Sequence, residues 1–174
     1  MLGCRDMLKT NRLELVGFDV KYAKDLYELW GDFEVIKFTY IPLLTTIDEC
    51  IDLIKHQVKR TDIDYMDRFV ILLNNRAIGT AGCICKDKVN SIFGLYYQIS
   101  RVNWGCGYAT EAASAIMQYV LNKYPKAIFQ AEAVSQNLAS TAVLMKFGFK
   151  QTHIEKNGFC RNNYELDLIH YSKD

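Results

Sequence analysis

Hydrophobic and polar residues follow two different periods in the first part of the chain. Segment 12–18 alternates apolar with polar residues, which is typical of a strand. Apolar residues three and four positions apart then predict a helix over residues 19–30, capped by Asp19. The same spacing predicts a second helix over residues 45–60, after a break at Pro42.

The middle of the chain predicts an antiparallel hairpin and a further strand. Segments 68–73 and 77–85 are short, apolar and rich in β-forming residues. The dipeptide Asn74-Asn75 between them tolerates the positive φ angles of a tight hairpin turn. Segment 92–99 has the same character and follows a polar turn, so we expect the next strand there.

The last third alternates helical and extended patterns. We expect a helix over residues 109–124, a strand over 127–134 and a helix over 137–147. Two closing strands, 149–155 and 162–169, are expected around a turn at Asn157-Gly158. This order predicts one domain spanning residues 1–174, of the α+β class, with helices flanking a mixed, largely antiparallel central sheet.

Composition and charge indicate which kinds of partner the protein can have. The 174 residues carry 21 basic and 20 acidic side chains, and a net charge of +1 gives no support for a nucleic-acid partner. No apolar run is long enough to span a bilayer, and residues 1–9 lack the apolar core of a signal peptide. We therefore expect a cytoplasmic protein without a membrane partner.

The six cysteines form no Cys-x-x-Cys pair, and we expect them to be reduced thiols. Cys83 and Cys85 fall on one face of a predicted strand, where packing explains them better than metal binding. We therefore expect no metal site.

The most distinctive segment is the turn Gly105-Cys106-Gly107, between the strand 92–99 and the helix 109–124. Glycines allow close approach of the backbone to a ligand, and a helix N-terminus offers unpaired N–H groups and the positive end of a dipole. Together these features suit a phosphate group. The segment is neither a Walker loop nor a dinucleotide fingerprint, and by itself it also fits a tight connection without a ligand.

Three motifs in order resemble the GNAT superfamily of acetyl-CoA-dependent N-acetyltransferases. Residues 104–109 resemble its acetyl-CoA motif, Gln/Arg-x-x-Gly-x-Gly/Ala. Residues 137–149 resemble an Asn-x-x-Ser…Lys-x-Gly-Phe helix, and residues 10–15 resemble the usual first strand. The run continuing to Ala112 is similar to the branch that includes the ribosomal-protein N-terminal (alanine/serine) acetyltransferases.

The resemblance implies that acetyl-CoA lies in a splay between the fourth and fifth strands of the sheet, which are segments 92–100 and 127–134 here. Its pantetheine arm would pair with backbone groups of the first of these strands, around Gln98 and Ile99, and a backbone N–H near residues 97–99 would polarise the thioester carbonyl. Trp104 stands where Gln or Arg is usual, and Cys106 lacks the common positive charge, which predicts weaker CoA binding. The expected cofactor-binding residues are Gln98, Ile99, Trp104, Gly105, Cys106, Gly107, Tyr108, Ala109, Thr110, Asn137, Ser140 and Lys146.

Ser140 and Glu132 are the expected catalytic residues. In the branch that this chain resembles, the serine at the Ser140 position lies near the acetyl thioester, where it protonates the departing thiolate or holds its hydrogen bond. Many GNAT enzymes place a tyrosine acid where this chain has Leu144. Asn137 is expected to cap the helix, and the resemblance adds a contact to the pantetheine.

The general base is less well defined by the sequence. Ile92 stands where the branch often carries a glutamate, so the usual base is missing. Glu132, His153 and Glu165 are candidate replacements, and Glu132 alternates with alanines in a way that directs it toward the splay. Loss of the amine proton directly to water remains an alternative.

The resemblance implies transfer of an acetyl group to a primary amine by direct attack in a ternary complex. We expect a protein or peptide N-terminal α-amine as the acceptor, with a small amine (antibiotic or polyamine) or a non-catalytic CoA-binding role as alternatives. A strongly acidic acceptor cleft would favour the small amine. A monomer and a homodimer are both open. The acceptor site is expected between the first two helices and the last two strands, with the aromatic candidates Trp30, Phe33, Tyr40, Tyr96 and Tyr164.

Overall fold

The computed structural model describes residues 7–59 and 66–174. The strands are β1 (Leu8–Lys9), β2 (Glu14–Val16), β3 (Met66–Leu73), β4 (Arg76–Asp87), β5 (Ile92–Ile99), β6 (Ile128–Val134), β7 (Lys150–Arg161) and β8 (Tyr164–Lys173). The α-helices are α1 (Ala23–Trp30), α2 (Phe33–Ile36), α3 (Ile47–Lys59), α4 (Tyr108–Lys123) and α5 (Leu138–Lys146). Short 3-10 turns precede α1 and follow β5. The expected end of the second helix, Arg60, lies outside the described residues.

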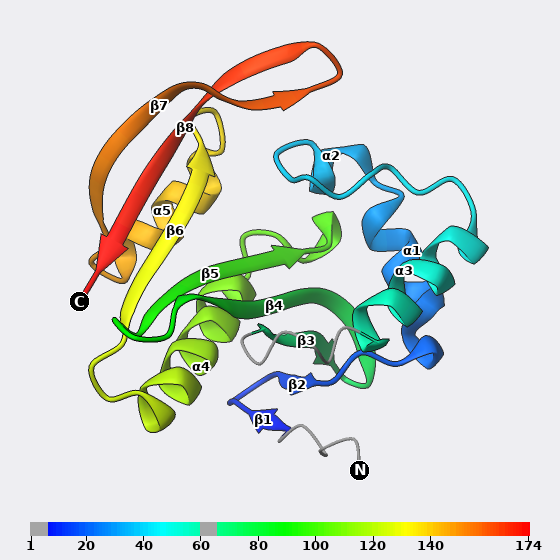
Figure 1. Ribbon diagram of the computed structural model, residues 1–174. Coiled ribbons are helices and arrows are strands. Elements are labelled where there is room, and N and C mark those ends of the chain that lie inside the picture. The colour runs from blue at the N-terminus through cyan, green and yellow to red at the C-terminus, as the bar shows by residue number, and fades with distance from the viewer. Residues whose placement is uncertain (1–6, 60–65) are drawn as a thin grey trace.

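The strands form one sheet in the order β1-β2-β3-β4-β5-β6-β8-β7, and every neighbouring pair is antiparallel except β5 and β6. Those two strands pair only over Ile92–Gly94 and Ile128–Gln130. Beyond this point they diverge, and Figure 1 shows them pointing apart. The expected α+β fold and its splay are confirmed. The splay lies between β5 and β6 because the two-residue strand β1, which the pattern does not predict, adds one to the numbering.

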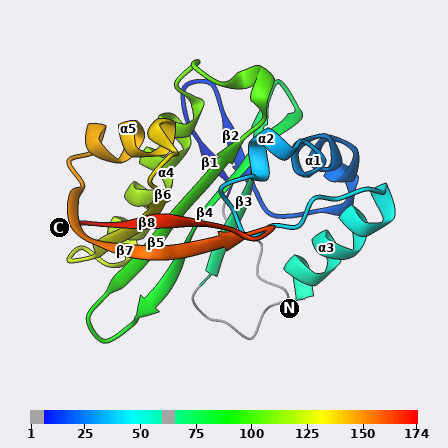
Figure 2. The same cartoon turned by 90° about the horizontal axis from the view of Figure 1, so that it is seen from above.

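Side-chain alternation along β3 directs neighbouring residues to opposite faces of the sheet. Phe69 and Ile71 join the core beneath α4, whereas Val70 and Leu72 join the core beneath α1 and α3. Figure 2 shows α4 and α5 on one side of the sheet and α1 and α3 on the other. The sheet therefore separates two hydrophobic cores.

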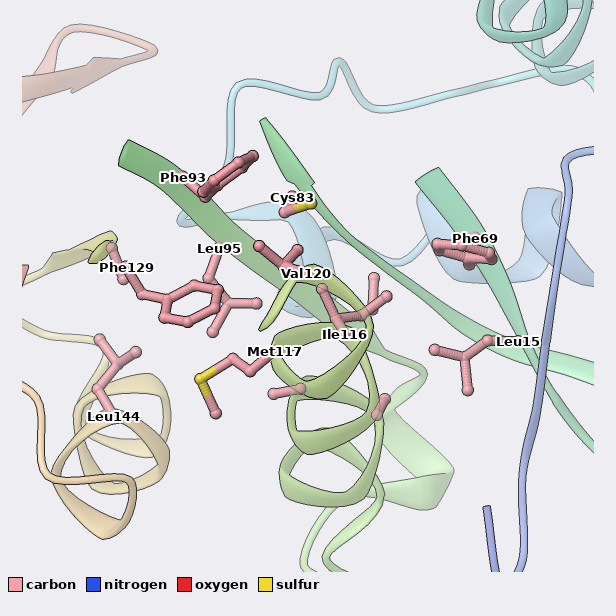
Figure 3. Close-up of a cluster of buried hydrophobic side chains, with 14 of the residues drawn as sticks. Leu15, Phe69, Cys83, Phe93, Leu95, Ile116, Met117, Val120, Phe129 and Leu144 are labelled. Atoms are coloured by element: carbon pink, nitrogen blue, oxygen red, sulfur yellow. The ribbon is translucent and has the colours of Figure 1, made fainter. Parts of the chain in front are cut away.

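Helix α4 packs its apolar face against the central strands. Ile116, Met117 and Val120 are buried beside Phe93 and Leu95 of β5. Figure 3 shows these side chains gathered between the helix and the strands. This packing fixes the N-terminus of α4 relative to the end of β5, and the glycine turn connects the two.

The last hairpin turns at Asn162-Asn163 and not at the expected Asn157-Gly158. The two asparagines of the turn have φ angles of 48° and 65°, the left-handed values that a tight two-residue turn requires. Asn74-Asn75, with φ of 49° and 64°, forms the expected turn of the first hairpin. Asn157, with φ of 54°, lies instead in an irregularity of β7 between Glu155 and Phe159. Both sites supply a positive φ, and only the pairing of β7 with β8 decides which one turns the chain.

Helix α2 is also absent from the sequence pattern, because it spans only four residues. Asp32 begins it by accepting a hydrogen bond from the Glu34 N–H. The segment that follows is fixed by Arg161 of β7, whose Nη1 donates to the carbonyl oxygens of Ile36, Thr39 and Ile41 at 3.3, 2.6 and 2.9 Å. This guanidinium holds the α2–α3 connection against the β7–β8 hairpin, over the open end of the splay.

The cysteines of the described residues are free thiols. Cys83 is buried in the core beneath α4 and Cys85 packs against the same core, so the two share a face as expected. Burial raises the pKa of Cys50 to about 11, which makes it inert. Within residues 7–59 and 66–174, no cluster of His, Cys, Asp and Glu suits a metal ion, and no helix has the length and apolarity to cross a membrane.

Candidate active site

The glycine turn presents the N-terminus of α4 to the splay. Gly105 and Gly107 have φ angles of 73° and 79°, which other residues rarely adopt. The Gly107 carbonyl oxygen accepts the first helical hydrogen bond, from the Glu111 N–H at 3.0 Å. The N–H groups of the first helical turn precede that bond and have no acceptor within the helix. These are the groups that the sequence predicts to bind an anion.

Arg12 and Glu111 brace this turn from behind. Glu111 accepts hydrogen bonds from the Arg12 backbone N–H (2.8 Å), from Arg12 Nε (2.7 Å) and from Thr10 Oγ1 (2.5 Å). Arg12 Nη1 donates to the Cys106 carbonyl oxygen at 3.0 Å, and the guanidinium lies 4.4 Å from the centre of the Tyr108 ring. Arg12 thus brings a positive charge to the turn in which Cys106 has none. The sequence motifs contain both residues but do not reveal that they meet.

The hydrogen bonds in this brace outweigh the cost of burying Glu111. Burial alone would raise the pKa of this carboxyl group, but hydrogen bonds from Thr10 and Arg12 and the Arg12 charge lower it below its ordinary value. The Glu111 side chain is 16% exposed and that of Arg12 is 45% exposed, so solvent screening is reduced on the carboxylate side of the pair. Glu111 therefore acts as a fixed carboxylate that positions Arg12 and the turn.

The edge of β5 that faces the splay extends beyond its pairing with β6. The Ser100 N–H donates to the Ile78 carbonyl oxygen at 2.8 Å, which fixes the phase of the β4–β5 ladder. Because backbone groups alternate between the two sides of a strand, Gln98 turns its N–H and C=O toward β4, and Tyr97 and Ile99 turn theirs toward the splay. The open edge thus offers Tyr97 and Ile99 for backbone pairing with a ligand, and the expectation for Gln98 is corrected.

Trp104 ties the end of this edge to the glycine turn. Its Nε1–H donates to the Ile99 carbonyl oxygen at 2.7 Å, while about half of the residue remains exposed. The backbone of Ile99 therefore keeps its N–H for a ligand and shares its carbonyl oxygen with the indole.

A cavity of about 590 Å³ follows the splay from the glycine turn to α5, and we call it the cofactor cavity. Most of the expected cofactor-binding residues line it: Gln98, Ile99, Trp104, Gly105, Gly107, Tyr108, Ala109, Thr110, Asn137 and Ser140. Cys106 does not line it, because its side chain is exposed and contacts the Trp104 carbonyl oxygen. Lys146 does not line it either, because it lies exposed at the opposite end of α5 from Asn137.

The N-terminus of α5 places Ser140 across the splay from Tyr97. Asn137 caps the helix, and its Oδ1 accepts the Ser140 N–H at 3.2 Å. The Tyr97 hydroxyl lies 3.2 Å from both Ser140 Oγ and the Ser140 carbonyl oxygen. Burial raises the pKa of Tyr97 to about 12, so its phenol is protonated at neutral pH. Leu144, where many relatives of the resembled superfamily have a tyrosine, is fully buried in the core.

A second cavity of about 590 Å³ lies on the other side of the splay, and we call it the acceptor cavity. It shares lining residues with the cofactor cavity: Phe38, Thr39, Tyr97, Gln98, Asn137 and Ser140. Trp30, Tyr40 and Tyr96 line it, as expected, and Trp30 Nε1 donates to Gln98 Oε1 at 3.1 Å. Phe33 and Tyr164 do not line it.

Glu132 is the only acidic side chain among the described residues that line the acceptor cavity. It extends from β6 on the face opposite to the buried Ala131 and Ala133, and its Oε1 lies 2.8 Å from Lys86 Nζ. The other base candidates, His153 and Glu165, lie on β7 and β8 and do not line the acceptor cavity. Of the three candidates, the structure brings only Glu132 to the cavity.

Comparison with known proteins decides the family. The family model for the acetyltransferase (GNAT) domain matches residues 12–150, which is most of the chain. This chain belongs to the GNAT acetyltransferase family. It is 26% identical over 148 residues to the N-acetyltransferase p20 of Bacillus licheniformis, covering 84% of this chain and 83% of p20. It is 23% identical over 174 residues to the N-acetyltransferase YoaA of Bacillus subtilis (strain 168), covering 95% of each.

Solved structures share the fold of this GNAT chain. The microcin C7 self-immunity acetyltransferase MccE, in complex with acetyl-CoA and AMP, superposes with a TM-score of 0.84 at 20% identity, covering 94% of this chain and 93% of MccE. RimL, a ribosomal L7/L12 α-N-protein acetyltransferase in complex with CoA, superposes with a TM-score of 0.85 at 17% identity, covering 97% of each chain.

The residues of this GNAT chain fit acetyl-CoA. A Cβ atom added at Gly105 would meet no atom within 4 Å, so the turn leaves open space where the cofactor cavity begins. The N-terminus of α4 suits the pyrophosphate, and the open β5 edge suits the amide-bearing pantetheine. The chain is an acetyl-CoA-dependent acyltransferase in which acetyl-CoA is the cosubstrate.

Proposed function

We propose that this GNAT enzyme acetylates the N-terminal α-amine of a protein or peptide. The observation that carries the proposal is the meeting of the two cavities at Tyr97 and Ser140, because a thioester on one side then faces an amine on the other. The acceptor cavity is lined mainly by aromatic and aliphatic side chains. Such walls suit the first side chains of a peptide better than a strongly hydrophilic amine.

Charge supports a peptide acceptor over a polycationic one. Among the described residues that line the acceptor cavity, the charged side chains are Arg68 and Glu132, and Glu132 is paired with Lys86. A polyamine or an aminoglycoside carries several positive charges and would find no excess of negative charge there. A peptide N-terminus carries a single positive charge. The fold shared with RimL is consistent with this choice, and the fold shared with MccE keeps a small-molecule acceptor as the second candidate.

The reaction places separate demands on the two sides of the splay. Acetyl-CoA supplies the activated acyl group. The amine nitrogen forms a bond to the carbonyl carbon, the carbon–sulfur bond breaks, and CoA leaves as a thiolate that takes up one proton. We assign to Ser140 the hydrogen bond or proton for sulfur, and to the N–H of Tyr97 or Ile99 at the open edge the polarisation of the carbonyl.

The amine must also lose protons, because an ammonium group is not a nucleophile. Glu132 is the group we assign to this step, directly or through a water molecule, since it is the carboxylate that lines the acceptor cavity. No glutamate stands at position 92, so the chain has no base at the usual place. The C–N bond forms in the ternary complex, and the protein contributes mainly position and the exclusion of water.

A panel of acceptors tests the proposal. The protein is incubated with acetyl-CoA and, separately, with peptides bearing free N-termini, with the same peptides blocked at the α-amine, and with polyamines and aminoglycosides. CoA thiol release gives kcat/KM for each. The proposal predicts that the free peptides exceed the blocked peptides and the polycations by at least about 100-fold. If kcat/KM with the polycations equals or exceeds that with the free peptides, the acceptor is a small molecule and not a peptide N-terminus.

A further inference from the structure

A small hollow of about 70 Å³ lies behind the acceptor cavity, between β4, β6, β7 and β8. Its lining includes Lys86, Glu132, Thr152, His153 and His170. Glu132 belongs to the lining of both this hollow and the acceptor cavity. The same carboxylate therefore faces the acceptor on one side and two histidines on the other.

The contacts in this hollow form a chain of proton-carrying groups. Glu132 Oε1 lies 3.7 Å from Nδ1 of His170, which is opposite Glu132 in the β6–β8 register. His170 Nε2 lies 3.1 Å from Glu155 Oε2, on β7. The exposed fraction of the side chain is 38% at Glu132, 21% at His170 and 54% at Glu155. This series of side chains thus leads from the acceptor cavity, through the shielded imidazole of His170, to solvent at Glu155.

Neighbouring groups hold the imidazole in this orientation. The His153 ring stacks on the His170 ring at 4.1 Å between centroids and 9° between planes. Thr152 Oγ1 donates to the His170 carbonyl oxygen and lies 3.2 Å from His153 Nδ1. We assign to His170 the tautomer in which Nε2–H donates to Glu155, which leaves Nδ1 as an acceptor toward Glu132.

Two other elements bring further charged or titratable groups to these residues, and Tyr171 of β8 also lines the hollow. Lys86 of β4 pairs with Glu132 at 2.8 Å and keeps the carboxylate in place. Tyr40, from the segment after α2, reaches over the hairpin, where its hydroxyl lies 3.5 Å from the Gly158 carbonyl oxygen. Burial and the charges of Glu132 and Glu155 raise the pKa of Tyr40, so its phenol is protonated at neutral pH.

We propose that His170 is a relay residue that carries the proton released by the acceptor amine from Glu132 to solvent. The proposal rests on the proposed function, because it requires an amine in the acceptor cavity. Imidazole is the side chain best suited to accept and return a proton near neutral pH. An acceptor that fills the cavity covers that side of Glu132, and the His170 side then provides the outlet.

The relay balances as one proton in and one proton out. The ammonium form of the acceptor gives a proton to Glu132, leaving the neutral amine. Glu132 passes it to Nδ1 of His170, through one water molecule or a small side-chain rotation that closes the 3.7 Å gap. His170 Nε2–H releases its own proton to Glu155, which passes it to solvent, and the carboxylate of Glu132 is restored. His170 is left protonated at Nδ1, and exchange of its ring protons with water returns the starting tautomer.

The pH dependence of kcat tests the relay. With a peptide acceptor at saturation, the wild-type kcat profile is expected to show an inflection in the range of about pH 5 to 8 where imidazole titrates. His170→Gln should lower kcat at pH 7 by roughly 10- to 100-fold and remove that inflection, with the Kd for acetyl-CoA unchanged. His56→Gln changes an exposed histidine of α3. This variant is the matched control and should behave as wild type. An unchanged profile in His170→Gln overturns the relay.

Chemical rescue separates proton transfer from a structural role. His170→Ala leaves space beside Glu132, and added imidazole is expected to restore at least a tenth of the lost kcat. If His170→Ala fails to fold, Glu155→Gln is measured instead and should lower kcat a few-fold at pH 7. No rescue, or no effect of Glu155→Gln, contradicts the proposal. If the wild-type enzyme is inactive with every peptide, that result contradicts the proposed function itself, before any variant is compared.

Discussion

The Tyr97 hydroxyl lies 3.2 Å from Ser140 Oγ, joining the open edge of β5 to the first turn of α5. This contact crosses the splay at the point where the cofactor and acceptor cavities meet. Because burial raises the Tyr97 pKa to about 12, the phenol remains a hydrogen-bonding partner of the serine over the whole physiological range.

Removing the serine hydroxyl tests its role directly. Ser140→Ala is expected to lower kcat by roughly 10- to 100-fold, because the hydrogen bond to sulfur strengthens as negative charge develops there. The Kd for acetyl-CoA should change less than about threefold. Single-turnover rates and cofactor titration give the two quantities. Full activity in this variant would remove Ser140 from the mechanism and leave water as the proton source.

Tyr97→Phe tests whether the phenol acts through the serine. The ring and its packing are kept, and only the hydroxyl contact with Ser140 is lost. We expect kcat to fall by about 3- to 30-fold, and the double variant with Ser140→Ala to be no slower than Ser140→Ala alone. A double-mutant cycle on kcat measures this. Fully additive effects would show that the two hydroxyls act independently.

Gly105 and Gly148 form a matched pair for testing the turn. Their φ angles are 73° and 78°, and an added Cβ meets no atom within 4 Å at either position, so alanine costs a similar strain of about 1 kcal/mol in both. Only Gly105 lines the cofactor cavity. Gly105→Ala should weaken acetyl-CoA binding about tenfold by calorimetry, while Gly148→Ala binds as wild type. Equal affinities would show that the turn is only a connection.

The Glu111 brace predicts a pH-dependent contribution to stability. The pKa of Glu111 is lower in the folded state, so its contribution is present above the unfolded value near 4.5 and is lost as the pH falls through the folded value. Glu111→Gln should lower the free energy of unfolding by about 1–3 kcal/mol at pH 7. That deficit should shrink below about pH 4.

Urea unfolding at several pH values measures both effects. Glu14→Gln, which removes the exposed pair with Lys9, is the control and should cost no more than about 0.5 kcal/mol. A Glu111→Gln deficit that grows on acidification would contradict the lowered pKa.

Local patterns predicted most of the fold because they depend on neighbours in the chain. The helix after the glycine turn and the hairpin at Asn74-Asn75 follow from apolar spacing and from residues that tolerate positive φ. The same logic failed at Asn157-Gly158, since Asn162-Asn163 supplies an equally suitable turn and the pairing of β7 with β8 decides between them. Helix α2 is too short for its period to appear.

The site was less accessible to sequence reasoning because its contacts are distant in the chain. Arg12 and Glu111 are 99 residues apart, and Tyr97 and Ser140 are 43 apart. Backbone groups of Gln98 and Ile99 were expected at the open edge, but the phase of the β4–β5 ladder turns Gln98 toward β4 and brings Tyr97 to the edge beside Ile99. His170 lies in a strand of ordinary polarity, and only the register of β8 against β6 brings it opposite Glu132.

The central claim is that the acceptor is an N-terminal α-amine, and the position of the transferred acetyl group tests it most directly. One peptide carrying both a free N-terminus and an internal lysine is incubated with enzyme and acetyl-CoA, and tandem mass spectrometry maps the product. Our account predicts a single acetyl group on the α-amine, formed about tenfold more slowly by Gly105→Ala under limiting acetyl-CoA. Acetylation of the lysine alone, or turnover only when a small amine replaces the peptide, would contradict it.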